Sequence, residues 1–473
     1  MKFRLLLTAC LLLTPVAFAE GLPDLGDYAQ SVLTPQDERR IGEEVMREIQ
    51  GSGELLNDIE IADYLGAVGY HLASNSSDNR QAFTFFVIQD RTINAFALPG
   101  GFIGVHTGLI TNARSESEMA SVLAHEIGHV VQRHIARMVA QQKRDTIPSF
   151  AMLALGILLA RANPQLAQAS ITATQAGLVQ KTLDYTREHE READRVGMQI
   201  LEKSGFDTRA MPAFFETLMK GTRFSDGSAP SFLRTHPLTT ERITDMRNRV
   251  EQMPYRQVQD SLEFHLVRAK IRALEGTPTE SVRYFENSLA EQKYSMEAAQ
   301  RYGLAIALMR DQRTDDALME IEKLRTQTVR HPMIDNLAAK LLLSRNRNAE
   351  AMELYRSALN LFPKHRGLIY GYAEALLSQY QPDLAIKLLE DKQQTFPGDA
   401  YLYELKSQAY TQQNKNLLRH QAQGEAYFRS YNLQGAVEQM ELAVRSGDGD
   451  FYQLSIAEAR LKELRQLIVE PTK

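Results

Sequence analysis

The stretch VLAHEIGHVVQRH, residues 122–134, carries two histidines four residues apart, with a glutamate directly after the first. On a helix, positions i and i+4 project from the same face, so His125 and His129 could share one Zn²⁺ at about 2.0–2.1 Å. Glu126 would lie beside them, placed to hold a water on the metal and take its proton during attack on a peptide carbonyl. The apolar flanks predict a buried helix, in which three polar side chains are costly without a ligand. We therefore predict a metal-dependent active site rather than an amphipathic helix that carries these residues by chance.

A site of this kind needs a third ligand, and the stretch YTREHEREADRVG, residues 185–197, offers one. The metzincin pattern would need a histidine at position 135, but Ile135 stands there and His134 is one position off. Glu190 and Asp194 are again four residues apart, so we predict that Glu190 binds the metal while Asp194 accepts a hydrogen bond from a ligand histidine. The surrounding charges alone would favour a solvated helix face. Together with the upstream histidines, the pair favours a two-histidine, one-glutamate site with an open position.

Three motifs together resemble a known metallopeptidase family. HEIGH at 125–129, EREAD at 190–194 and THPLTTERI at 235–243 look like those of the membrane-linked gluzincins, the family of HtpX and the CAAX prenyl proteases. The motifs occur in the right order, and the resemblance covers essentially the whole mature chain. It implies Zn²⁺ held by His125, His129 and Glu190, with Glu126 as the general base, in an endopeptidase that acts on misassembled outer-membrane proteins.

One departure from that family changes the expected substrates. Members that act within membranes carry transmembrane helices, whereas the central apolar segment of this chain, FAMLALGILLA at 150–160, is shorter than the roughly 20 residues that a span needs. We expect a buried or interfacial helix there, with peripheral membrane contact left open. The expected clients are therefore periplasmic: misfolded or stalled outer-membrane proteins, with the outer-membrane β-barrel assembly machinery as a partner of the C-terminal part of the chain.

The stretch INAFALPGG, residues 93–101, is predicted to form a strand that ends in a tight turn. At the edge of a sheet, such a strand could pair with an extended substrate backbone. The family resemblance supports Asn94, Ala95 and Phe96 in this role. An internal core strand is an equally good interpretation of the same residues.

His236 stands in a loop introduced by the polar run SDGSAP. A loop histidine can reach the open metal position, displace the water and keep the enzyme inactive until the loop moves. We predict His236 as a regulatory fourth ligand. The alternative is a histidine that only supports a ligand or the fold.

The N-terminus has the pattern of an export signal. Lys2 and Arg4 precede the apolar run LLLTACLLLTPVAFA, and this order of charged, apolar and small residues predicts a secretory signal over residues 1–19. The run is short for a membrane anchor, and a lipoprotein site at Cys10 would leave few apolar residues before it. Cys10 is the one cysteine of the chain, so the mature protein would hold no disulfide, and we predict a bacterial periplasm as its location.

The chain of 473 residues, 44% hydrophobic and 24% charged, is long enough for more than one domain. Helical periodicity precedes and follows a region rich in Phe, Ile and Val at 81–112, which predicts two or three strands. We therefore predict a mainly α fold, with a zinc metallopeptidase domain that includes a small β-sheet over residues 20–254 and an α-solenoid over residues 255–473. A net charge of −5 without a sustained basic run argues against nucleic acid as a partner.

The C-terminal part repeats with the 34-residue period of tetratricopeptide repeats. Ala317, Ala351 and Ala385 are spaced by that period, and an alanine stands twelve positions before each of them. The step from Ala385 to Ala436 is longer, so we expect an irregularity there and predict four repeats plus a partial one. Stacked helix pairs expose a concave surface that suits extended peptides. An alternative function follows, in which the chain is a chaperone or scaffold and its metal site is masked or vestigial.

Overall fold

The computed structural model describes residues 33–78, 81–141, 173–222, 231–327 and 330–469. The predicted signal at 1–19 and the apolar segment at 150–160 lie outside the described residues. Helices dominate the described part of the chain and three short strands form its sheet, so the predicted mainly α fold is confirmed. No helix in these ranges combines the length and the hydropathy that a membrane span needs.

A three-stranded sheet in the order β1-β3-β2 supports the site. β1 (Thr84–Ile88) runs parallel to β3 (Phe102–His106), and β2 (Ala95–Leu98) runs antiparallel to β3. The turn between β2 and β3 is η1 (Pro99–Gly101), whose two glycines have φ of 75° and 81°, a region that favours glycine. β2 is therefore an edge strand of the described sheet rather than an internal one, and its pairing with a substrate stays a prediction.

Helices cover both faces of the sheet because the side chains of β1 alternate between two apolar clusters. Phe86 and Ile88 pack with α2 (Pro35–Ser52), whereas Phe85 and Val87 join the larger core on the opposite face. Both faces of this strand are thus buried, and the sheet forms the middle layer of the N-terminal part.

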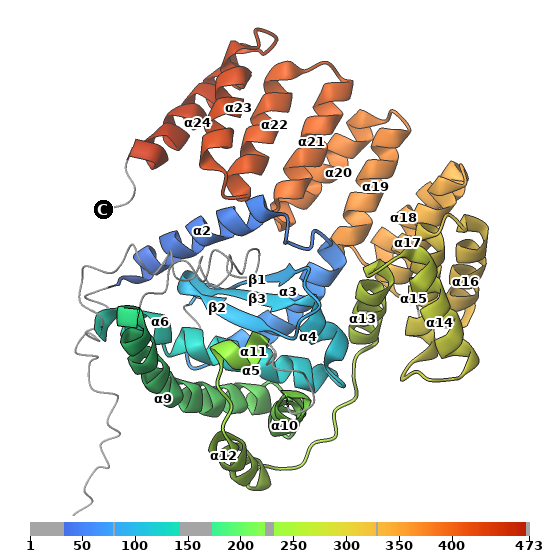
Figure 1. Cartoon of the computed structure of the whole chain (residues 1–473). Helices are drawn as coiled ribbons and strands as arrows, with labels where there is room; N and C mark the ends of the chain where they lie inside the picture. The colour runs from blue at the N-terminus through green and yellow to red at the C-terminus, as the bar shows by residue number, and fades with distance from the viewer. Residues whose placement is uncertain (1–32, 79–80, 142–172, 223–230, 328–329, 470–473) are drawn as a thin grey trace, which may run out of the picture.

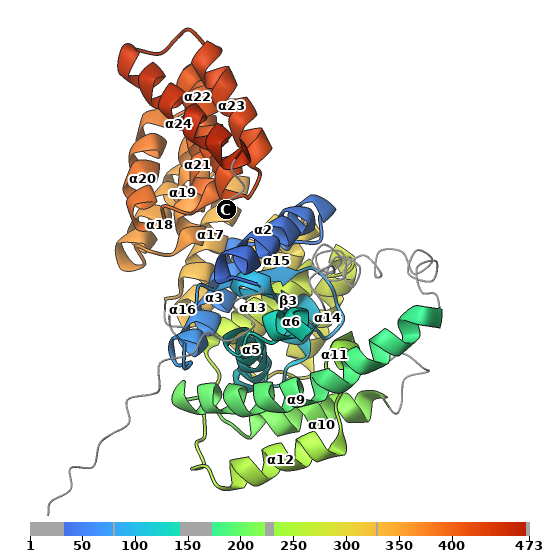
Figure 2. The same ribbon diagram turned by 90° about the vertical axis from the view of Figure 1, so that its left-hand side faces the viewer.

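The larger core is built on α3 (Ile59–Ser74) and α5 (Glu116–Val131), the helix that contains the histidine motif. α9 (Ala173–Lys203), which carries Glu190, packs along α5, and Figures 1 and 2 both show it on the side of α5 away from the sheet. The remaining helices of this part are α4 (Thr107–Asn112), α6 (His134–Gln141), α10 (Ala210–Thr222), α11 (Ser231–Thr235) and α12 (Thr240–Glu251).

From α13 onward, the described residues form six consecutive helix pairs. The first three pairs are α13 (Leu262–Leu274) with α14 (Pro278–Ala290), α15 (Glu297–Arg310) with α16 (Thr314–Gln327), and α17 (Pro332–Ser344) with α18 (Asn348–Leu361). The last three are α19 (Arg366–Ser378) with α20 (Pro382–Thr395), α21 (Ala400–Gln412) with α22 (Asn416–Arg429), and α23 (Leu433–Arg445) with α24 (Phe451–Val469). Figure 1 shows these pairs stacked into an arc around the sheet. The domain boundary near residue 254 stays a prediction.

The predicted count of four repeats and a partial one is wrong, because the described residues contain six helix pairs. Ala317, Ala351 and Ala385 each lie on the second helix of a pair and are fully buried, as their spacing predicted. One further period falls on Arg419 of α22, where the small residue is missing. Ala436 lies on α23, the first helix of the next pair, so it is out of phase with the other three. A Cβ on Gly424 of α22 would lie 3.2 Å from the Ala436 carbonyl oxygen, so α22 and α23 are the helices that pack closely here, and the expected irregularity is one additional helix before them.

The array contacts the N-terminal part through α3 and α2. Lys270 of α13 lies 2.6 Å from a carboxylate oxygen of Asp58 and 2.6 Å from one of Glu60, at the start of α3. Farther along the array, the Tyr431 carbonyl accepts a hydrogen bond of 2.8 Å from Arg47 Nε of α2. Since α3 also packs on α5, the array and the histidine motif share one supporting helix.

Candidate metal centre

α5 and α9 approach each other closely because each carries a glycine at their contact. A Cβ on Gly128 would lie 3.0 Å from the Ala193 carbonyl oxygen, and a Cβ on Gly197 would lie 3.0 Å from the Ala124 carbonyl. Both glycines belong to the motif stretches of the sequence. They let the two helix backbones pack near enough for their polar side chains to meet in one site.

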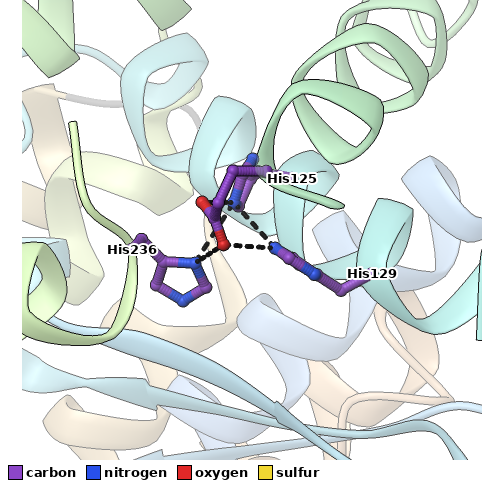
Figure 3. Close-up of side chains that lie close together, drawn as sticks. His125, His129 and His236 are labelled. Atoms are coloured by element: carbon purple, nitrogen blue, oxygen red, sulfur yellow. Dashed lines mark hydrogen bonds and ion pairs between the residues drawn. The ribbon is translucent and has the colours of Figure 1, made fainter. Parts of the chain in front are cut away.

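Four side chains converge between α5, α9 and the segment that follows α11. His125, His129, Glu190 and His236 each offer one nitrogen or oxygen atom, and these atoms all lie within 4.8 Å of one another. The Nε2 atoms of His125 and His129 are 3.0 Å apart, and Glu190 oxygens lie 3.4 Å from the first and 3.3 Å from the second. Figure 3 shows the three imidazoles directed toward a common centre. Imidazole nitrogens and a carboxylate oxygen that face one point fit the donor set of a divalent transition metal.

Asp194 and Arg242 hold the outer side of this cluster. Asp194 Oδ1 lies 3.0 Å from His125 Nδ1, the contact that its spacing predicted. Arg242 of α12 donates to both oxygens of Asp194 at 2.7 and 2.8 Å, and its Nη1 lies 2.9 Å from Glu190 Oε2. The same Nη1 donates to the Pro237 carbonyl at 2.8 Å. Arg242 therefore links the carboxylates of α9 to the segment of His236, a role that its place in THPLTTERI did not reveal.

Glu126 is fully buried one helical step from His125. Neither of its carboxylate oxygens has a hydrogen bond to the described part of the chain, and Oε1 lies 3.3 Å from His236 Nε2. A buried carboxylate without donors is costly unless a bound group faces it. Its burial beside the converging ligands fits the predicted role of general base.

Burial and neighbouring charges set the protonation of the cluster. Burial lowers the pKa of His129 from its usual value of 6.5, which keeps the imidazole neutral and able to bind a metal. Burial also opposes charge on Glu190, but His236, His129 and the hydrogen bond from His125 hold the pKa of Glu190 well below 4.5. For His125, hydrogen bonds to Asp194 and Glu190 outweigh burial and raise the pKa to about 10. Metal binding at His125 therefore competes with a proton.

His134 lies behind the cluster rather than in it. Its Nδ1 is 2.8 Å from Nδ1 of His129, the ring nitrogen on the side away from His125. Burial lowers the pKa of His134 to about 2, so its imidazole is neutral. The sequence predicted no role for His134, which stands one position before the histidine that the metzincin pattern would need.

Asn94 directly precedes the edge strand β2, and Ala95 and Phe96 are its first two residues. The side chains of Asn94 and Ala95 are buried and that of Phe96 is half-buried. Phe232 of α11 donates its backbone N–H to the Ile93 carbonyl at 3.3 Å. α11, which directly precedes His236, therefore contacts the chain just before β2.

Comparisons with known proteins agree with this geometry. Residues 62–250 match the model of Peptidase family M48, and residues 342–409 match a model of the tetratricopeptide repeat. The beta-barrel assembly-enhancing protease of Escherichia coli (strain K12) is 34% identical over 451 residues, which cover 95% of this chain and 92% of that protein. A putative protein of the same name from Vibrio cholerae is 36% identical, with 88% of this chain and 86% of that protein covered.

A more distant relative matches about half of the chain. Mitochondrial metalloendopeptidase OMA1 of Arabidopsis thaliana is 28% identical over 250 residues, which cover 52% of this chain and 48% of that protein. Among solved structures, the tetratricopeptide protein YrrB covers 39% of this chain and 93% of its own, at 12% identity and a TM-score of 0.29. By its match to the bacterial proteases over nearly its whole length, the chain belongs to peptidase family M48, as a metallopeptidase with C-terminal tetratricopeptide repeats.

Proposed function

We propose that this chain is a zinc-dependent endopeptidase of the periplasm, with chaperone-like activity, in the quality control and assembly of outer-membrane β-barrel proteins. The names of its bacterial relatives support the process, and the N-terminal sequence supports the compartment. The convergence of His125, His129 and Glu190 beside the buried Glu126 is the observation that carries the proposal. Its clients would be misfolded or stalled outer-membrane proteins, and its repeats would bind the β-barrel assembly machinery.

Each side chain of the site has a chemical task in this proposal. Zn²⁺ held by His125, His129 and Glu190 would polarise the scissile carbonyl and activate a water. Glu126 would take the proton of that water and deliver it to the amine of the departing peptide. Asp194 would accept the Nδ1 proton of His125 in a hydrogen bond and so keep the Nε2 lone pair free for the metal. The backbone of β2 would align an extended substrate along α5.

His236 would block this chemistry in the arrangement described. Its Nδ1 lies 3.0 Å from Glu190 Oε1 and its Nε2 lies 3.3 Å from Glu126 Oε1, so the ring fills the space between ligand and base. The attacking water and the substrate carbonyl need that same space. We propose that His236 is a fourth ligand, displaced together with its segment when a substrate pairs with β2.

His236→Ala is therefore expected to raise kcat/KM for an unfolded protein substrate. The measured kcat/KM is proportional to the fraction of molecules in which His236 has left the site. If the form with His236 in the site is favoured about tenfold, its removal should raise kcat/KM about tenfold. Cleavage rates of the variant and the parent would be compared at equal metal content, with His71→Ala on the exposed face of α3 as the matched control. A loss of activity in His236→Ala would instead assign His236 a structural role.

The ligand set is tested by metal content. The purified protein is expected to hold one Zn²⁺ per chain by elemental analysis, and Glu190→Gln is expected to lose most of it, because an amide oxygen is a far weaker ligand than a carboxylate. Glu188→Gln is the matched control, since Glu188 lies on the same helix but is exposed. Full metal retention in Glu190→Gln would remove Glu190 from the ligand set, and absence of metal from the parent would overturn the peptidase proposal.

One feature of the structure also suits the alternative function of a scaffold. His236 lies against both Glu126 and Glu190, so the site described is closed. A protein that works mainly through its repeats could keep such a site permanently masked. The two functions differ in whether cleavage is needed, which a variant that lacks the general base tests.

A further inference from the structure

The two histidines of the metal motif are supported differently on their outer sides. His125 faces the carboxylate of Asp194, whereas His129 faces the imidazole of His134, with 2.8 Å between the two Nδ1 atoms. His134 is 4% exposed, and its Nε2 lies 3.2 Å from Glu192 Oε2 of α9. The same oxygen accepts a hydrogen bond of 2.9 Å from Arg137.

The protons of this chain of contacts can be placed in one consistent way. If His129 binds a metal through Nε2, its Nδ1 must carry the proton and donate it. His134 Nδ1 must then accept, which leaves the proton of His134 on Nε2, where Glu192 accepts it. The opposite tautomer of His134 would point a second proton at His129 Nδ1, or force the proton of His129 onto the nitrogen that faces the metal. In this arrangement His129 Nδ1 donates to His134 Nδ1, and both His134 Nε2 and Arg137 donate to Glu192.

We propose that His134 is a positioning residue for the metal ligand His129: its Nδ1 accepts a hydrogen bond from His129 Nδ1 and its Nε2 is held by Glu192, which fixes the tautomer and the ring orientation in which His129 Nε2 binds the metal. This inference rests on the metal site of the proposed function and gives a role to a histidine that does not itself bind the metal. Ring stacking supports it, because the His134 ring lies 4.1 Å from that of His189 at an interplanar angle of 10°. The stack and the Glu192 contact together hold the plane of the His134 ring.

The charge of the site explains why His129 contacts an imidazole at position 134, whereas His125 contacts the carboxylate of Asp194. Glu126, Glu190 and Asp194 are buried carboxylates, and Arg242 is a buried cation. Together with a divalent metal, these four groups already balance. A carboxylate in place of His134 would add a buried negative charge beside the carboxylate of Glu192, which is costly. A neutral acceptor supports His129 without that penalty.

The test compares metal affinity in four forms of the full chain. Zn²⁺ dissociation constants would be measured by chelator competition for the parent, His134→Ala, His134→Gln and His265→Ala. His134→Ala is expected to bind about 10–100-fold more weakly, the usual effect of removing such an outer partner. His134→Gln should recover most of the affinity, because its amide can accept from His129 and donate to Glu192. His265 is a buried histidine of α13, so His265→Ala is the matched control and should bind as the parent does.

A spectroscopic readout separates positioning from general loss of structure. In the Co²⁺-substituted protein, the visible absorption bands report ligand geometry; they should change in His134→Ala but not in His265→Ala. If His134→Ala does not fold, Glu192→Ala at the partly exposed end of the chain of contacts decides, with weaker metal binding in support and parental binding against.

Results that contradict the role of His134 can be distinguished from results that contradict the proposed function. Parental affinity in His134→Ala, or equal losses in His134→Ala and His134→Gln, would overturn the positioning role while the metal site stands. A parent chain that binds no Zn²⁺ would overturn the metal site itself, and the inference with it.

Discussion

Glu126→Gln is expected to lower kcat for peptide cleavage by at least about 10²–10⁴-fold, the usual contribution of a positioned general base. The substituted amide would keep the size and burial of the side chain but could not take a proton from water. Its two neighbours on the metal helix, His125 and His129, are unchanged, so one metal per chain should remain. Cleavage of an unfolded outer-membrane protein, followed at saturating substrate, measures the effect.

A matched control makes this result specific. Glu118→Gln changes a carboxyl group that is also buried on α5 and that accepts from the Arg114 backbone N–H at 2.7 Å, a contact an amide oxygen can keep. It should cleave at nearly the parental rate. Parental activity in Glu126→Gln would contradict the assignment of the base. Loss of cleavage with retained rescue of client assembly would favour the scaffold function over the peptidase.

The pairing of side chains within each of the two metal-binding helices could be predicted, because it depends on local geometry alone. His125 and His129 share one helix face, and so do Glu190 and Asp194, since both pairs are four residues apart. The spacing therefore predicted which side chains would point together within each helix. That the two helices meet depends on tertiary packing through Gly128 and Gly197, and for this step the family resemblance supplied what the spacing could not.

The role of His134 could not be predicted, because it depends on a break in the helix. On a continuous helix, a residue five positions after His129 would point about 140° away from it. α5 ends at Val131, and Arg133 adopts a φ of 52°, a left-handed conformation that redirects the chain into α6. This turn brings His134 back against His129, and no sequence signal marked Arg133 as the break. Arg242 was missed for a related reason, since its partners Asp194 and Glu190 lie far from it in the sequence, on another helix.

Lys270→Met is expected to lower the free energy of unfolding by about 3–5 kcal/mol, the usual effect of removing one partner of a buried ion pair. Lys270 Nζ lies 2.6 Å from Glu60 Oε2, and Glu60 is 4% exposed, so the variant would leave a buried carboxylate without its cation. Asn336 donates to the other oxygen of Glu60 at 2.8 Å, but an amide does not neutralise the charge. Urea unfolding followed by circular dichroism measures the change, with Lys293→Met at an exposed ion pair as the matched control.

The pH dependence of the free energy of unfolding provides a second test of this prediction. Burial opposes charge on Glu60, but Lys270 and neighbouring cations lower its pKa below 4.5 in the folded protein, so the pair contributes stability above pH 4.5 and loses it as pH falls further. Burial likewise opposes charge on Lys270, but Glu60 and Asp58 raise its pKa above 10.5, so its contribution is present below pH 10.5 and is lost as pH rises through the folded value. The free energies of unfolding of Lys270→Met and the parent should therefore differ most near neutral pH. This difference should become smaller as the pH falls below 4.5. A difference that stays constant from neutral to acid pH would mean that Lys270 stabilises the docking of the array on α3 through packing of its side-chain methylenes rather than through charge.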